Sequence, residues 1–373
     1  MSAILVPTKR ILSLDVFRGL TIVLMILVNS QGNQYAYPIL EHAQWNGCTL
    51  ADLVFPFFLF IVGLTSVISL NKSKGLHDKS EIYRGVFKRS ILLFVLGLIL
   101  NIFPHFTIDI HTIRVYGVLQ RIAVCYLICS FIYLNTTIKA QSLIFLGILW
   151  GYWFVMTLVP VPGYGTNQLT MDASWVSYLD QLIFSKYHLL AKTYDPEGFF
   201  STLPSVATTL SGVLTGSLLL HSMSSQKKCF VMFLVGGIFL LLGWIWDFSF
   251  PINKNLWSSS FVLWSSGLAL ITFAFCYLII DILNYTQWAL PLKIFGMNAL
   301  FAFIFHVMLL KLQFAAHFGL SDGTSGNLKS KITETLFGMY SSSNAALFYS
   351  LTFILLNFLV VSYLYKRKIF IKI

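Results

Sequence analysis

Long apolar segments alternate with short polar ones along almost the whole chain. Ten of the apolar segments have the roughly 20 residues that a helix needs to cross the hydrocarbon core of a bilayer. We expect these helices near residues 12–31, 49–70, 87–104, 113–134, 141–160, 199–221, 229–248, 258–282, 292–312 and 344–365. The pattern predicts an all-α integral membrane protein, a polytopic bundle of about ten transmembrane helices.

The composition supports this class of protein. Hydrophobic residues make up 57% of the chain and charged residues only 10%, whereas a soluble domain has about 25% charged residues. Because nearly all 373 residues belong to the spans and their connections, we expect one transmembrane domain over residues 1–373. The longest connections cover about 161–198 and 313–343, and loops of that length usually carry function.

The net charge of +11 does not indicate a nucleic-acid partner, because the Lys and Arg residues lie in short clusters between spans. Most of these clusters lie on one side if the chain begins in the cytoplasm, so the positive-inside rule predicts both termini in the cytoplasm. The two long loops are then extracytoplasmic. Lys9 and Arg10 precede an apolar run as in a signal peptide, but Asp15 and Arg18 interrupt that run, and we expect an uncleaved first span.

The cysteines predict neither a disulfide framework nor a metal site. There are five, Cys48, Cys125, Cys129, Cys229 and Cys276, and no CxxC motif occurs. Four of them lie in or at the ends of apolar segments, where a thiol usually serves as a small hydrophobic group. We therefore expect no metal.

A polar island between the first two spans holds the best candidates for chemistry. His42 follows Asn29 and precedes Asp52, which interrupts the start of the second span. A neutral imidazole is a suitable general base, a carboxylate can fix its tautomer, and an amide can orient a substrate or polarise a carbonyl. The structural alternatives are an interfacial histidine and, for Asp52, a helix N-terminal cap together with Thr49.

Charged and amide side chains also occur inside the predicted spans, where a charge costs about 2.5 to 3.5 kcal/mol at the helix centre. Asp15 and Arg18 are three residues apart and either pair on one helical face or leave Arg18 to meet a phosphate at the cytoplasmic mouth of a pathway. Gln120 and Arg121 lie within the fourth span. Such an arginine needs an interior partner or a ligand-lined cavity.

The ninth predicted span carries Asn298 and His306, eight residues apart. On one straight helix they share a face and can line a polar groove, and the alternative is a hydrogen bond between helices for either of them. The turn over residues 195–198, DPEG, enters the sixth span. Glu197 is well placed there for a helix N-terminus, and we interpret this turn as structural.

Six segments together resemble the heparan-alpha-glucosaminide N-acetyltransferase family of membrane acetyltransferases. They are LDVFRG, HAQWNGCTLADLVFPFFLFIVG, GVLQRIAV, DPEG, NKNLWSSSFVL and GMNALFAFIFHV, in the family's order from residue 12 to about residue 310. The resemblance implies that acetyl-CoA binds from the cytoplasmic side and that its acetyl group passes to a glucosamine-type amine on the far side. It also implies that His42 is the catalytic histidine, with Asn29 and Asp52 at active-site positions.

The resemblance extends more loosely to the cofactor. It makes Arg18, Gln120, Arg121, Asn298 and His306 the candidates for binding acetyl-CoA. The chain resembles the shorter prokaryotic members that lack a large luminal N-terminal domain, so we expect it in a bacterial inner membrane. The animal members suggest a homodimer.

Alternatives remain at the level of the sequence. His42 acts either as a general base or as a carrier that is itself acetylated. A transporter or flippase of an amino sugar or lipid-linked sugar is a second hypothesis, which discontinuous spans and inverted repeats would favour. No internal repeat is found. A purely structural role leaves the charges within the spans unexplained.

Overall fold

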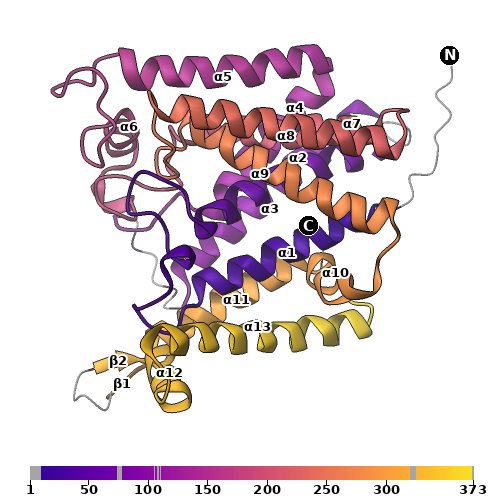
Figure 1. The fold of residues 1–373 in the computed structure, drawn as a ribbon. Coiled ribbons are helices and arrows are strands. Elements are labelled where there is room, and N and C mark those ends of the chain that lie inside the picture. Colours follow the sequence, from indigo (N-terminus) through magenta and orange to yellow (C-terminus); the bar gives the residue numbers. More distant parts are fainter. Residues whose placement is uncertain are drawn as a thin grey trace.

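The computed structural model describes residues 10–73, 78–104, 106, 109, 111–319 and 325–371. Within these residues, nine α-helices are long and apolar enough to cross a membrane. They lie side by side (Figure 1), which confirms the predicted all-α membrane bundle. The nine are α1 (Leu12–Asn29), α2 (Leu50–Ser73), α3 (Lys79–Ile102), α4 (Val118–Asn135), α5 (Ile138–Leu158), α7 (Thr202–Leu220), α8 (Ser225–Asp247), α9 (Ser259–Tyr277, continued by a π-helical turn to Ile282) and α13 (Ser342–Lys366).

The segment predicted as one straight span at 292–312 is bent. After a 3-10 turn (Gln287–Ala289), α10 (Leu290–Met297) and α11 (Ala299–Ala315) meet at an angle of 70°. Asn298 forms the corner, with φ −122° and ψ 36°. The prediction of a straight helix was wrong because hydropathy records how apolar a segment is and not whether its backbone continues. Counted as one bent span, the pair raises the spans among the described residues to ten.

Both long connections contain secondary structure. The first holds α6 (Trp175–Phe184) and a 3-10 turn (Lys186–His188). The second holds an antiparallel pair, β1 (His317–Gly319) and β2 (Ser325–Asn327), followed by α12 (Leu328–Phe337). Figure 1 shows α6 and α12 at the same end of the bundle, on the left. A further 3-10 turn (Pro38–Leu40) lies between α1 and α2.

Glycines allow two helix pairs to pack with their backbones in contact. A Cβ atom added to Gly19 of α1 would lie 1.8 Å from the carbonyl oxygen of Leu292, and one added to Gly296 would lie 1.8 Å from that of Asp15. Between α2 and α7, an added Cβ at Gly63 or Gly212 would lie 2.0 Å from a carbonyl oxygen of the other helix. Small residues at contacts drive helix association where lipid removes the hydrophobic effect. These contacts hold α1 and α2, and so the ends of the polar island, in place.

One face of α8 is apolar and points away from the protein. Phe230, Leu234, Ile238, Leu241 and Ile245 follow one another at helical spacing, and all five side chains are exposed. Such a long apolar stripe would be unfavourable in water, but it fits the hydrocarbon core of a bilayer. The outer surface of α8 therefore agrees with the membrane assignment.

Candidate active site

His42 and Asp52 form a hydrogen-bonded pair. Nδ1 of His42 lies 2.8 Å from Oδ1 of Asp52, and the side chains are 52% and 2% exposed, respectively. A carboxylate bonded to Nδ1 holds the ring in the tautomer that leaves the lone pair of Nε2 free. Within the described part of the chain, no hydrogen-bond partner of Nε2 is found. An exposed imidazole on a buried carboxylate suits proton transfer to or from a ligand.

Asp52 also caps the helix that carries it. Its Oδ2 accepts hydrogen bonds from the backbone N–H groups of Ala43 and Thr49 and from the Thr49 hydroxyl, each at 3.1 Å. These bonds satisfy donors around the start of α2, as caps do. One carboxylate oxygen of Asp52 therefore contacts His42 and the other caps α2, which confirms the capping interpretation, while the chemical one stays a prediction.

The loop between α8 and α9 docks against the His42 loop. The backbone N–H of Gly47 donates to the carbonyl oxygen of Ile252 at 2.7 Å, and the side chain of Asn253 donates to Asn46 at 3.1 Å. Gly47 has φ +107°, a conformation that residues other than glycine rarely adopt. Two loops that are distant in sequence therefore build one site.

This docking brings Lys254 to the pair. Its Nζ lies 3.2 Å from Nδ1 of His42 and 3.6 Å from Oδ1 of Asp52. Sequence reasoning used the segment that contains Lys254 for the family resemblance but did not identify Lys254 as a site residue. A lysine in an otherwise uncharged stretch just before a predicted span was the signal that could have found it.

The connection 161–198 touches the same loop through Trp45. The indole N–H of Trp45 donates to the carbonyl oxygen of Leu169 at 2.8 Å, and the rings of Trp45 and Tyr194 pack edge to face with centroids 5.3 Å apart. The first long connection thus borders the His42 loop.

Asn29 is placed differently from His42 and Asp52. It is the last residue of α1 and its side chain is exposed. Among the described residues, no hydrogen bond joins it to His42 or Asp52. The residues that follow it are held by the C-terminal part of the chain, since Gly32 N–H donates to the carbonyl oxygen of Ala346 at 3.2 Å.

Arg121 and Gln120 are fully enclosed by protein. The Arg121 guanidinium donates to the carbonyl oxygen of Gly198 at 2.9 Å and to the hydroxyls of Ser201 and Ser205, and it lies 5.0 Å from the ring centre of Trp257. Gln120 is 1% exposed and packs against Gly97 of α3. The structure therefore places Arg121 among interior oxygen atoms and an aromatic ring.

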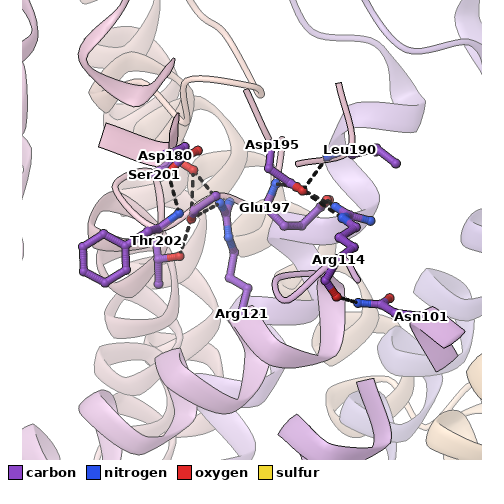
Figure 2. A network of polar contacts seen from close by, with 11 residues as sticks. Asn101, Arg114, Arg121, Asp180, Leu190, Asp195, Glu197, Ser201 and Thr202 are labelled. Carbon is purple, nitrogen blue, oxygen red and sulfur yellow. Dashed lines mark hydrogen bonds and ion pairs between the residues drawn. The ribbon is translucent and has the colours of Figure 1, made fainter. Parts of the chain in front are cut away.

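An ion-pair cluster joins the start of α4 to the turn before α7 (Figure 2). Arg114 binds both carboxylate oxygens of Asp195, at 2.8 and 2.6 Å, and one oxygen of Glu197 at 2.5 Å. Burial acts to lower the pKa of Arg114, but the bonds and charges of the two carboxylates outweigh it and raise that pKa. Burial likewise acts to raise the pKa of Glu197, but Arg114, Arg121 and Lys254 outweigh it and lower that pKa. Arg114 and Glu197 are therefore both charged at neutral pH.

The sequence assigned the 195–198 turn only a helix-capping role and left Arg114 without a partner. A separation of 81 positions, which includes α4, α5 and α6, lies between Arg114 and Asp195, so no sequence spacing indicated the contact. The paired acidic residues in an apolar chain were the only local signal.

Asp180 is expected to make the stability of the protein depend on pH. Burial raises the pKa of Asp180 to about 6, against the opposing effect of N–H groups from Phe199 and Phe200. An unfolded aspartate titrates near pH 3.9. The contribution of Asp180 to the free energy of unfolding is therefore fully present below about pH 3.9 and is lost as the pH rises through 6. In this range the folded chain keeps a proton that the unfolded chain releases. The loss is about 3 kcal/mol, since one pKa unit corresponds to about 1.4 kcal/mol.

Thermal unfolding in detergent from pH 4 to 8 checks this expectation. Asp180→Asn keeps the acceptor oxygen and removes the charge. The difference in melting temperature between this variant and the wild type should therefore shift in favour of the variant from pH 4 to 6.5 and stay constant above pH 6.5. Asp172→Asn, an exposed change in the same connection, is the control. A lead that does not vary with pH would contradict the assignment.

Arg18 lies at a junction of two cavities. One, of about 750 Å³, is lined by Arg10, Asp15, Arg18 and Lys72 among others. The second, of about 470 Å³, is mainly apolar and extends from Arg18 and Arg89 between α2, α3, α4 and α11. The Arg18 guanidinium also bonds to Asp15 at 3.3 Å and to the carbonyl oxygen of Gly296 at 3.1 Å. Arg18 is thus paired with Asp15, the first of the two alternatives, and also lines both cavities; its contact with a phosphate stays a prediction.

Asn298 and His306 do not line a common groove on one straight helix. At the bend, Asn298 donates to the carbonyl oxygen of Ile369 at 3.0 Å and accepts from the N–H of Ile371 at 3.1 Å. His306 lies on α11, 1% exposed, with its ring 5.5 Å from that of Phe353. The expected groove was wrong because Asn298 lies at the corner between α10 and α11, whereas His306 lies within α11. Asn298 instead ties the C-terminal tail to the bend, beside the second cavity, which Ile371 also lines.

The described residues contain no group of three or more His, Cys, Asp or Glu side chains that could hold a metal ion. All five cysteines are free. Burial, together with the charge of Asp52, raises the pKa of the Cys48 thiol to about 12, so this neighbour of the site is neutral.

Fold and site together define a polytopic membrane protein with an exposed histidine hydrogen-bonded to a buried carboxylate at one end of the bundle. The family described as "Heparan-alpha-glucosaminide N-acetyltransferase, catalytic" matches residues 10–244. This match covers more than half of the chain, and the chain belongs to this family. His42, Asp52 and the Arg114 cluster lie within the match, whereas Lys254 lies beyond it.

Two curated relatives are similar over longer stretches. The heparan-alpha-glucosaminide N-acetyltransferase of Homo sapiens is 28% identical over 98% of this chain and 60% of its own length. The mouse protein of the same name, from Mus musculus, is 29% identical over 81% of this chain and 54% of its own length. The chain thus spans between half and two thirds of the length of these relatives.

Proposed function

We propose that this chain is a transmembrane N-acetyltransferase that moves an acetyl group from acetyl-CoA to the amine of a glucosamine-type sugar. The observation that carries the proposal is the exposed His42 imidazole held by the buried Asp52 at 2.8 Å. The names of the curated relatives support the acceptor class. We place the protein in a bacterial inner membrane with acetyl-CoA entering from the cytoplasm and His42 near the extracytoplasmic side.

In the direct reaction, the nitrogen of the acceptor amine attacks the thioester carbonyl while Nε2 of His42 takes a proton from that amine. The C–S bond breaks, the C–N bond forms, and the proton passes to the departing CoA thiolate. Asp52 holds the ring and stabilises the imidazolium. Asn29 is our candidate for the oxyanion donor or the substrate clamp. In the alternative reaction, Nε2 attacks the thioester carbonyl, the C–S bond breaks, and CoA leaves as the thiolate. The amine then attacks the acetyl carbon, the bond between that carbon and Nε2 breaks, and the proton lost by the amine neutralises the thiolate.

We propose the cavities at Arg18 as the binding region for acetyl-CoA. The larger one has the cationic side chains that nucleotide phosphates need, Arg10, Arg18 and Lys72. The apolar one shares Arg18 and Thr65 with it and has room for a pantetheine arm. Arg89 lines its wall. We propose Arg18 as a phosphate contact. Gln120, Arg121, Asn298 and His306 stay weaker candidates, because they are buried and line neither cavity.

Replacing Arg18 with glutamine is expected to weaken acetyl-CoA binding by about tenfold or more, because a hydrogen bond to a charged group contributes about 1.5 to 3 kcal/mol. Calorimetric titration of the purified protein with acetyl-CoA measures the change. Arg84→Gln removes an exposed arginine of α3 and should leave the affinity unchanged. Equal affinities for the Arg18 variant and the wild type would remove Arg18 from the binding site.

The transporter hypothesis keeps one observation in its favour. The bend at Asn298 is a discontinuous span, a feature of many secondary transporters. An amino sugar or lipid-linked sugar would then cross the bundle without acyl transfer.

The deciding experiment is acetyl-CoA turnover by the purified protein in detergent, with glucosamine and related amino sugars as acceptors. Acceptor-dependent release of CoA and mass-spectrometric detection of the N-acetylated sugar would support the transferase. Release of CoA without acceptor, with acetyl on His42, would favour the carrier reaction. If acetyl-CoA neither binds nor turns over and reconstituted vesicles take up the sugar, the transporter replaces this proposal.

A further inference from the structure

We propose that Lys254 is a positioning residue of the His42–Asp52 pair, whose ammonium offsets the charge of Asp52 and keeps the imidazole neutral in the resting protein. This inference rests on the proposed function of His42 as a base or nucleophile. Both reactions need an unprotonated Nε2. A histidine beside a lone buried carboxylate is drawn towards the charged form, which has no lone pair to offer.

The contacts place Lys254 where it affects both members of the pair. Its Nζ lies 3.2 Å from Nδ1 of His42 and 3.6 Å from Oδ1 of Asp52. The Lys254 side chain is only 16% exposed, so solvent screens its charge weakly. A positive charge at this distance opposes a second positive charge on the imidazole ring.

The backbone around Lys254 is tightly held. Asn253 N–H donates to the Ser258 hydroxyl at 3.1 Å, and the Asn253 side chain accepts from Leu256 N–H at 2.9 Å. The same side chain donates to Asn46 in the His42 loop. Because the two loops are bonded to each other, the ammonium is held beside His42 by a fixed scaffold.

The other charged or titratable groups around the pair leave this role to Lys254. Cys48, in the His42 loop, is buried and neutral, as its raised pKa shows. Glu41 is the exposed neighbour of His42 in sequence, where water screens its charge. Glu197, from the turn before α7, interacts with Lys254 and is bound to Arg114. Lys254 is thus the one cation that the described residues place in contact with His42 and Asp52.

The hydrogen bond between Nδ1 and Asp52 determines which ring nitrogen of a neutral His42 can act as the base. A protonated Nδ1 donates to Asp52 and leaves Nε2 as a base, while Lys254 pairs with Oδ1 of Asp52. When Nε2 takes a proton during the reaction, the ring becomes a second cation beside Lys254. The added repulsion favours passing that proton on to the CoA thiolate.

The pH dependence of kcat/KM tests the inference. In Lys254→Met the carboxylate acts on His42 unopposed, so the acidic limb of the profile should move up by at least about one pH unit. Activity lost at neutral pH should return at alkaline pH. Lys254→Arg keeps the charge and should keep the wild-type profile. Lys329→Met removes a lysine that bonds to the carbonyl oxygen of Gln31 and serves as the matched control.

A second readout needs no turnover. Diethyl pyrocarbonate modifies neutral imidazoles, and mass spectrometry of the His42 peptide gives the modified fraction at each pH. The midpoint, the pH at which half of the exposed His42 is modified, should also rise by about one unit in Lys254→Met. If the midpoint moves and no amino sugar is acetylated, the inference stands and the proposed function fails. If neither the midpoint nor the acidic limb moves, the inference is overturned, and a rate lowered equally at every pH would assign Lys254 a structural role only.

Discussion

Replacing His42 with alanine is expected to lower acetyl transfer by about 10²- to 10⁴-fold, the usual contribution of a general acid–base group. The loss is larger if His42 carries the acetyl group, because the covalent route then disappears. The fold should survive, since the His42 side chain is 52% exposed and, among the described residues, it contacts polar groups only of Asp52 and Lys254. CoA released in the presence of an amino sugar measures the effect.

The control for this prediction is His221→Ala. His221 is also exposed and is the C-cap residue of α7. This helix starts beside Arg121 and ends at the opposite end of the bundle. This variant should turn over at the wild-type rate. Wild-type turnover in His42→Ala as well, with both proteins equally folded, would exclude His42 from the chemistry.

Replacing Arg114 with methionine is expected to destabilise the protein by about 3 to 5 kcal/mol, because breaking a buried ion pair from one side leaves its partner charged and unpaired. Asp195 is 0% exposed and Glu197 is 9% exposed, so water cannot replace the lost guanidinium. The apolar stem of methionine preserves most of the volume. The melting temperature in detergent should therefore fall sharply.

A triple variant separates charge from packing. Adding Asp195→Asn and Glu197→Gln to Arg114→Met removes the stranded charges and should recover a large part of the lost stability. Arg84→Met, on the exposed side of α3, should change the melting temperature little. If the single Arg114 variant melts like the wild type, the cluster contributes little to stability and its place beside the His42 loop would need another explanation.

The spans were predictable because each depends on a local property. About 20 apolar residues in sequence are sufficient to cross a bilayer, whatever lies around them. Nine predicted segments correspond to helices of spanning length among the described residues. The remaining segment, predicted at 292–312, is bent at Asn298. This bend depends on tertiary contacts, namely the close approach of Gly296 to α1 and the hydrogen bonds to the C-terminal tail.

The functional site was predictable only in part. His42 and Asp52 are ten residues apart, His42 in the loop before one span and Asp52 in its first turn, so the sequence already favoured a contact between them. Lys254 and Arg114 reach their partners over 212 and 81 positions, respectively. Contacts at such separations follow from how loops dock at the ends of the helices, and a single sequence carries no record of that docking.

By itself, the sequence determined that this is a polytopic α-helical membrane protein and which family it resembles, and it offered His42 and Asp52 as a candidate pair. Hydropathy and short-range spacing act along the chain, and these conclusions need nothing more. Only the tertiary structure decided that the ninth span is bent, that Arg18 faces two adjoining cavities, and that a lysine stands beside His42. These features arise where helix ends meet, because buried charges must find partners wherever packing places them.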